Sequence, residues 1–224
     1  MANYGALIDL PNGNPFITPE STPFCLFRRV VVGSSANGTA QSAAADINLG
    51  GDYPAIAFVK TTHTAQPTVV GSSRVGNVVK VSASNPFGQG FTMTAYIFAI
   101  FPQTLPRWGF AIWDKTGELV LTNESRVLSD LVTVGSPGAN GGINIDQTLN
   151  GSYAVAPGIL GSTLIRFFVQ GQPQVISVTA FTGARFDGSR TRISAASSGN
   201  ATGDVVGYTN NGNAIMAINT ANYD

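Results

Sequence analysis

The sequence has few charged residues, which make up 11% of its 224 residues, whereas an ordinary soluble domain has about 25%. Twelve basic and twelve acidic residues give a formal net charge of zero. A neutral chain has no electrostatic attraction for nucleic acid or for an anionic bilayer, so neither is an expected partner. A surface with so few charges also does little to keep monomers apart. The composition therefore favours permanent self-assembly, with a simply soluble neutral protein as the alternative.

Cysteine, histidine and long apolar runs are also scarce. The single cysteine, Cys25, excludes an intrachain disulfide and a Cys-based zinc site, and its apolar neighbours predict a buried thiol. The longest apolar stretch, residues 92–102, is far shorter than the roughly 20 residues that cross a bilayer. The first residues lack the basic and apolar regions of a secretory signal. We therefore expect no membrane span, and synthesis in the cytoplasm.

No motif in the sequence points to catalysis. The only histidine, His63, has polar neighbours and no nucleophile elbow accompanies it, so a surface-loop histidine is favoured. Nothing singles out a pair among the twelve acids as the facing carboxylates of a glycosidase. Three arginines lie within residues 184–192, where a solvated loop or a salt bridge between subunits is favoured over an anion site. We predict no enzyme activity, no metal and no cofactor, with a glycan-cleaving enzyme as the remaining alternative.

Two similar segments are present instead, residues 4–34 and residues 108–136. Identical residues at matched positions are Gly5 and Gly109, Ile8 and Ile112, Gly13 and Gly117, Thr18 and Thr122, Glu20 and Glu124, and Ser21 and Ser125. We interpret this similarity as an internal duplication. It predicts a first module at residues 1–104, a second module at 105–187, and a C-terminal arm at 188–224 that contains another hairpin.

The local pattern predicts strands almost throughout. Short runs rich in β-branched and aromatic residues are separated by Gly, Pro, Asn and Ser. Each module opens with a predicted hairpin, around residues 11–14 in the first and 114–118 in the second. Residues 39–47 form the one predicted turn of helix. The predicted class is all-β: two tandem, duplicated β-sandwich-like modules and a C-terminal β-hairpin arm.

Arg28 and Asp130 occupy equivalent positions of opposite charge in the matched strands of the two modules. An unpaired charge among apolar neighbours is costly. If the modules pack about a pseudo-two-fold axis, these two side chains pair across it. Solvent-facing strand ends are the alternative explanation.

Aromatic and amide side chains supply the other interaction candidates. Trp108 and Trp113 are five positions apart, which places them on opposite faces of a regular strand and predicts one in the core and one exposed. Tyr208, Asn210 and Asn211 lie at the predicted C-terminal hairpin, where exposed aromatic and amide groups are suited to gripping glycans.

The opening pattern resembles that of small tail-tip proteins of long-tailed bacteriophages. It consists of an N-terminal Met and a small-polar lead, then "YG" or "WG", a short strand, a turn ("PNGN", "DKTGE"), and "SRVLSDLVTVG" with its valine-rich strand. The resemblance covers the two hairpin segments, about a third of the chain. The doubled module and the C-terminal arm go beyond the single-module pattern.

This resemblance implies a structural protein of the virion, located in the phage tail and made in the host cytoplasm. Its expected partners are itself, as a ring or a trimer, and other proteins of the tail tip or tail fibre, with a contribution to host attachment. The alternative is a receptor-binding head that recognises carbohydrate on the host surface.

Overall fold

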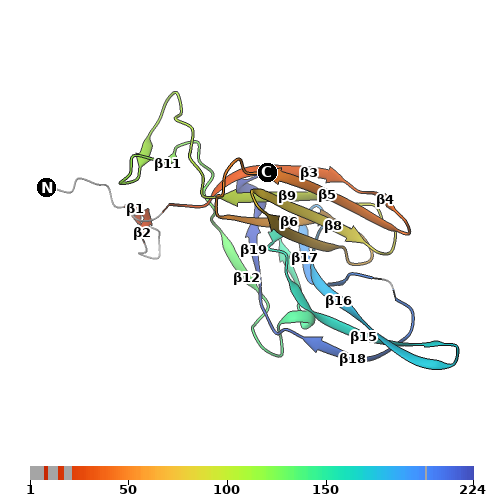
Figure 1. Cartoon of the computed structure of the whole chain (residues 1–224). Coiled ribbons are helices and arrows are strands. Elements are labelled where there is room, and N and C mark those ends of the chain that lie inside the picture. The colour runs from red at the N-terminus through yellow and green to blue at the C-terminus, as the bar shows by residue number, and fades with distance from the viewer. Residues whose placement is uncertain (1–7, 10–14, 18–21, 200) are drawn as a thin grey trace.

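The computed structural model describes residues 8–9, 15–17, 22–199 and 201–224 (Figure 1). These residues form β-strands and two short 3-10 helices, η1 (Gly142–Asn144) and η2 (Thr220–Asn222), and no α-helix occurs among them. The predicted all-β class is confirmed.

A four-stranded sheet covers one face of the N-terminal half. Its strand order is β4 (Ser35–Asn37), β5 (Ala40–Asn48), β8 (Val78–Asn85), β7 (Val69–Val75). The predicted helix at residues 39–47 is wrong, because this segment is strand β5, which pairs along its length with β8. Ala43, Ala45 and Ile47 alternate toward the core, and this period-2 burial together with the ladder to β8 overrides the helix propensity of alanine.

A larger branched sheet is built around β6 (Ala55–Thr62). One edge of β6 pairs with β9 (Thr92–Ala99), which in turn pairs with β3 (Cys25–Gly33). The other edge of β6 pairs with β14 at Val59 and, in parallel, with β16 at residues 61–62. The main path runs β12 (Leu131–Val134), β19 (Ile215–Asn219), β14 (Tyr153–Val155), β6, β16 (Gln172–Phe186), β15 (Ile159–Val169), β18 (Asp204–Asn210); β17 (Arg190–Ser197) and β13 (Asp146–Asn150) branch from β16.

Strands from residues 1–104, 105–187 and 188–224 therefore share this one sheet. The division into two duplicated modules and an arm stays a prediction. The β10 (Ala111–Trp113) and β11 (Leu119–Thr122) hairpin forms around residues 114–118 as predicted. Its counterpart pairs β1 (Ile8–Asp9) with β2 (Pro15–Ile17), and its predicted turn at 11–14 lies outside the described residues.

The predicted C-terminal hairpin is wrong. Strands β18 and β19 do not pair with each other: β18 pairs with β15, whereas β19 lies between β12 and β14. Burial of Ile215, Ala217 and Ile218 draws β19 into the centre of the sheet. The physical reason is that apolar burial of one strand outweighs local pairing across the Asn-Gly turn.

The core lies on both faces of β6 and β9. One face packs against the four-stranded sheet, through side chains such as Val59, Met93 and Val81. The opposite face is covered by the C-terminal segment, in a cluster of Phe58, Tyr96, Phe98, Ala154, Ile218 and Tyr223. The rings of Phe98 and Tyr223 meet edge to face with centroids 4.9 Å apart. Cys25 is buried at the edge of this structure, as predicted, and burial raises the pKa of its thiol to about 11.

Two projections leave this body. Strands β15 and β16 extend as a long hairpin whose turn residues, Gln170 and Gly171, both have positive φ, as a two-residue hairpin turn requires. β18 pairs with the outer edge of β15. From here on, "the arm" means these three strands, β15, β16 and β18, and not the predicted C-terminal arm of residues 188–224. The β10–β11 hairpin projects at the other end of the molecule (Figure 1).

Replacing Phe58 by alanine tests the two-sided core. Phe58 is fully buried, so we expect Phe58→Ala to lower the free energy of unfolding by about 3–5 kcal/mol, from lost burial and the cavity left behind. Phe87→Ala is the matched control, because Phe87 is 39% exposed and its loss should cost much less. Urea unfolding measures both. Equal losses would contradict this assignment of the core.

Candidate functional site

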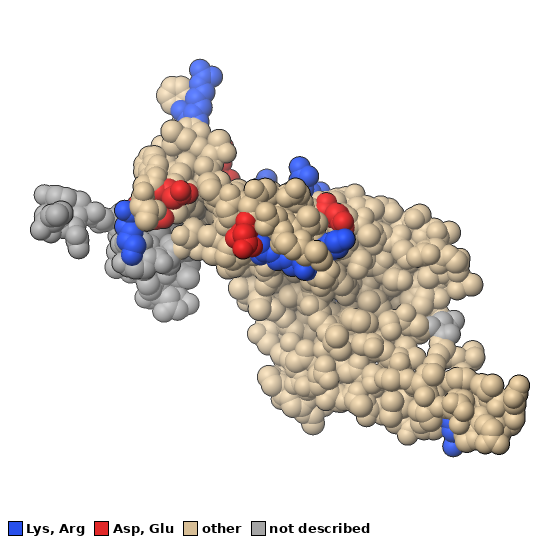
Figure 2. All heavy atoms as spheres, viewed as in Figure 1, with Lys and Arg blue, Asp and Glu red and all other residues tan. Residues whose placement is uncertain are grey.

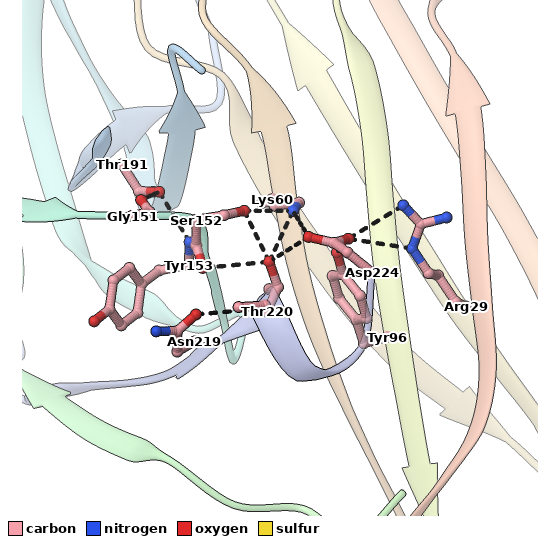
Figure 3. Close-up of polar contacts among 11 residues, drawn as sticks. Arg29, Lys60, Tyr96, Gly151, Ser152, Tyr153, Thr191, Asn219, Thr220 and Asp224 are labelled. Carbon is pink, nitrogen blue, oxygen red and sulfur yellow. Dashed lines mark hydrogen bonds and ion pairs between the residues drawn. The ribbon is translucent and has the colours of Figure 1, made fainter. Parts of the chain in front are cut away.

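A cluster of charged and hydroxyl side chains lies on the face of β6 that the C-terminal residues cover (Figure 3). Lys60 extends the stripe of Phe58 along the same face of β6, since residues two apart share a face. Tyr96 comes from β9 and Arg29 from β3, while Thr220 and Asp224 come from the end of the chain. The sheet therefore gathers groups that are far apart in the sequence.

Lys60 is the buried centre of the cluster, with only 7% of the residue exposed. Its Nζ donates to Ser152 Oγ at 2.6 Å, to Thr220 Oγ1 at 2.9 Å and to Asp224 Oδ2 at 3.2 Å. An ammonium has three N–H donors, and all three are used. Burial lowers the pKa of Lys60, and the charge of Asp224 opposes that shift.

Asp224 joins both cations of the cluster. Its Oδ1 accepts from Arg29 Nη2 at 3.1 Å, from Arg29 Nε at 3.3 Å and from the Tyr96 hydroxyl. Burial of the carboxyl raises its pKa, but the hydrogen bonds from Tyr96 and Thr220 and the charge of Lys60 outweigh burial and bring the pKa of Asp224 to about 2. Burial, followed by the hydrogen bond to Asp224, raises the pKa of Tyr96.

This arrangement fixes the C-terminal segment to the sheet, and we call it the Asp224 clasp. The Lys60 ammonium is held by acceptors on all sides and keeps no lone pair for nucleophilic or base chemistry. Next to it, the Tyr223 hydroxyl donates to Val127 O at 2.9 Å and accepts from Ser129 N at 2.8 Å. The geometry supports a mechanical role in which polar bonds position the strand and turn that cover the back of the core.

The sequence analysis missed Lys60 and Asp224. The available signal was the run "AIAFVK", in which a lysine shares a strand face with Phe58. A cation on a buried face requires an acid, because an uncompensated buried charge is costly. Nothing in the local pattern shows that this acid is supplied 164 residues away.

A pocket of about 560 Å³ lies at the base of the arm and contains two of the predicted interaction residues. Its lining has no charged side chain and consists of Ile143, Asn144, Thr163, Ala180, Ala195, Ala196, Ser197, Tyr208 and Asn210. Tyr208 is 64% exposed. Asn211 is not in the lining, and its side-chain amide instead donates to Ile159 O at 3.1 Å. The structure thus brings Tyr208 and Asn210 to one pocket and uses Asn211 to hold the loop.

Trp108 and Trp113 are both exposed, at 78% and 53%, so the expectation that one is in the core is wrong. The alternation on which it rested is interrupted, because the β10–β11 register shifts between Ile112 and Trp113 and Trp108 precedes the strand. The guanidinium of Arg107 lies 6.0 Å from the ring centroid of Trp108.

Arg28 and Asp130 form no ion pair with each other, so the pairing hypothesis is wrong. Both residues are exposed, which agrees with the alternative of solvent-facing positions. β3 is irregular between Leu26 and Arg28, and Asp130 has a φ of 55°, so the two segments do not keep the common alternation. Asp130 instead accepts from Asn222 Nδ2 at 2.9 Å. The neighbouring Arg29 is the residue that pairs, with Asp224.

Comparisons with known protein families, curated proteins and solved structures found no match for this chain. Across the described ranges, no helix is long and apolar enough to cross a membrane. The same part of the chain holds no group of three or more His, Cys, Asp or Glu side chains arranged to hold a metal ion.

Acid unfolding tests the Asp224 clasp. A carboxyl whose pKa is depressed in the folded state contributes stability above its unfolded pKa, and that contribution is lost as the pH falls toward its folded pKa. For Asp224 the window runs from about pH 4, an ordinary carboxyl pKa, down to about 2. We expect Asp224→Asn to lower stability at neutral pH by on the order of 1 kcal/mol, with solvent screening of the partly exposed carboxylate taken into account, and to flatten this acid limb.

The measurement is urea unfolding at a series of pH values. Asp52→Asn is the control, because Asp52 is 91% exposed in its pair with Arg74 and an exposed pair contributes little. A wild-type acid limb that Asp224→Asn leaves unchanged would rule out the clasp as its cause.

Proposed function

We propose that the protein is a structural subunit of a multimeric assembly. In the setting that the resemblance implies, this assembly is the tail tip or tail fibre of a long-tailed bacteriophage. There the protein binds copies of itself and other tail proteins around the distal tail and contributes to host attachment. The proposal assigns no reaction to it. The single observation that carries the assembly role is the apolar surface of the arm.

The arm exposes large apolar side chains on all three of its strands. They are Ile159, Phe168, Val169, Val175, Ile176, Val205, Val206 and Tyr208, each 39% to 64% exposed. Its one ion pair joins Arg166 and Asp204 at 3.1 Å. On the face shown in Figure 2, charged atoms gather on the upper part of the molecule and the arm at lower right is almost free of them. Val175 and Ile176 are consecutive in a regular strand and point to opposite faces, so the arm presents apolar side chains on both of its faces. Large exposed apolar side chains gathered on one element mark a protein interaction site.

The outer edge of the arm is also open. Among the described residues, β18 pairs only with β15, which leaves its second edge without a strand partner. An edge strand with free N–H and C=O groups is a template for pairing with another chain. The apolar side chains and the open edge of the arm thus both suit a protein partner.

A second group of exposed apolar side chains lies on and just before the β10–β11 hairpin, which is at the opposite end of the molecule (Figure 1). It is formed by Leu105, Trp108, Phe110 and Trp113, all more than half exposed. Two unlike surfaces at two ends suit head-to-tail contacts, which close into a ring when the rotation between subunits allows. This geometry supports a ring, with the trimer as its smallest form. We include in the same proposal that the β1–β2 and β10–β11 hairpins arose by duplication of one module.

Solution mass tests the assembly. We expect the wild-type protein to be an oligomer at micromolar concentration and the double variant Val175→Asp/Val205→Asp to be a monomer, because two buried carboxylates would oppose contact through the arm. Both residues are exposed in the subunit, so the variant should keep the circular dichroism spectrum of the folded wild type. Val31→Asp/Val75→Asp is the matched control, since both valines are exposed outside the arm. Light scattering after size exclusion gives the masses. A monomeric wild type at every concentration would overturn the proposal.

The second candidate function is a receptor-binding head for host glycans. It is favoured by the uncharged pocket in which Tyr208 and Asn210 meet, because an aromatic ring with amide and hydroxyl groups suits a neutral sugar. We expect a glycan array to detect binding that Tyr208→Ala abolishes and Trp108→Ala, which removes an exposed ring elsewhere, retains. Silence on every array, together with stable oligomerisation, would count against this candidate.

A further inference from the structure

A second cleft, of about 330 Å³, lies between the segment that leaves β6 and the segment that enters β13. It shares Ile143 and Ala195 with the pocket at the base of the arm. One wall is Ala65, Gln66 and Pro67, and the other is Ile143, Ile145 and Asp146. The remaining lining comes from β16 and β17 and includes Arg185, Arg192 and Ser194. Arg185 and Arg192 are register partners, which places their side chains on the same face of the sheet. We call this cleft the Arg185 pocket.

Arg185 is buried, with 4% of the residue exposed. Its Nη1 donates to Thr64 O at 2.8 Å and to Ala65 O at 3.2 Å. A guanidinium carries five N–H donors, so those on Nε and Nη2 remain. Neither nitrogen has a hydrogen-bond partner among the described residues. In that part of the structure every fully buried side-chain nitrogen does have a partner, so Nε and Nη2 are not fully buried. These donors therefore keep some contact with solvent, and Arg185 is one of the residues that line the pocket.

Among the described residues Arg185 forms no direct ion pair, and the more distant charge of Asp146 favours its protonated form while the charge of Arg192 opposes it. Arg192 forms a two-point pair with Asp146, with Nε to Oδ1 at 2.7 Å and Nη2 to Oδ2 at 2.6 Å, and these two charges cancel. Within the part of the chain that the structure describes, no carboxylate lies within 4.0 Å of the Arg185 guanidinium. Burial lowers the pKa of Arg185, followed by the charge of Arg192, but an arginine in a protein stays protonated.

Ser194 adds a second polar group to the lining. Only 7% of Ser194 is exposed, and its hydroxyl bonds to no described residue. A guanidinium fork beside a hydroxyl matches the planar, two-oxygen geometry of a carboxylate. The net charge of the lining is +1, which one carboxylate neutralises. A phosphate monoester carries nearly twice that charge and would meet the Asp146 carboxylate, so it suits the pocket less well.

We propose that the Arg185 pocket binds a small organic carboxylate, with the buried guanidinium of Arg185 as its principal contact. The volume is at the lower end of the about 300–1,000 Å³ that ligand pockets occupy, which limits the ligand to a single small unit such as a sugar acid. The hydroxyl of Ser194 and the amide of Gln66 supply partners for its hydroxyl groups. The assignment is independent of the assembly role, because the arm's apolar surface takes no part in it.

Thermal unfolding with D-glucuronate as the probe tests this assignment. A ligand that binds the folded state alone raises the melting temperature in a saturable way. At constant ionic strength we expect D-glucuronate to stabilise the wild-type protein, and D-glucose and inorganic phosphate to have no such effect. Arg185→Gln should weaken glucuronate binding by about tenfold or more, the usual worth of a charged hydrogen bond. Arg166→Gln, in an exposed ion pair on the arm, should not.

A second pair of variants leaves Arg185 intact, in case Arg185→Gln does not fold. Ala65 is exposed at the wall of the pocket, and its backbone carbonyl, which holds Arg185, is kept by any substitution. Ala65→Glu places a carboxylate beside the guanidinium and should compete with the ligand, whereas the isosteric Ala65→Gln should not. Equal glucuronate affinity in the two variants, no response of the wild type to glucuronate, or a larger response to phosphate would each overturn the assignment.

Discussion

The structure depends on two strands, β6 and β9, that are covered on both faces and have strand partners at both edges. On one face they meet the four-stranded sheet, and on the other they meet the C-terminal segment. Removal of their apolar side chains from water is the main source of stability available to a chain with so few charges. Burial of the second face also requires residues from the end of the chain, such as Ile218 and Tyr223, to pack against strands formed by its first hundred residues. The order of strands in the large sheet follows from that packing.

The Asp224 clasp helps to position the C-terminal segment on the sheet, although it adds little net stability. An ion pair near a core contributes little net stability, since desolvation of both charges offsets their attraction, but it penalises any arrangement in which the partners separate. Lys60 has three acceptors and lies 5.4 Å from the ring centroids of both Tyr96 and Phe186. A C-terminal segment displaced along the sheet would leave that ammonium buried without an acid. The clasp therefore acts on specificity: it selects one position for β19 and η2.

Two buried cations in the same protein differ in a way that bears on function. Lys60 has its carboxylate within the chain, and its environment is complete. Arg185 is similarly buried, but no carboxylate of the described residues lies within 4.0 Å of its guanidinium, and it lines a cleft. The arm shows the corresponding contrast for apolar groups, because β16 is buried near the body and exposed toward its tip. For both places we propose a partner, a small anion for Arg185 and another protein surface for the arm.

Much of the secondary structure could be predicted from the sequence, because alternation and turn residues act over a few positions. The runs that became β3, β6, β8 and β9, the β10–β11 hairpin, and the burial of Cys25 were all accessible in this way. The strand at Ala40–Asn48 was not, since its alanines suit a helix until β8 pairs with them. The segment at 204–219 shows the same limit, as its Asn-Gly turn indicates a hairpin that the buried position of β19 prevents.

The candidate sites also differ in whether a local sequence pattern could reveal them. Tyr208 and Asn210 could be proposed from composition and a nearby turn, because exposed aromatic and amide groups have a local signature. The pairing of Lys60 with Asp224 and the isolation of Arg185 have none, because each depends on residues brought together across the sheet. The sequence by itself determined the all-β class, most strands and the low charge that favours association. Only the tertiary structure decided which charges are paired and which surfaces are left open, since burial and distance between remote residues exist only once the sheets have formed.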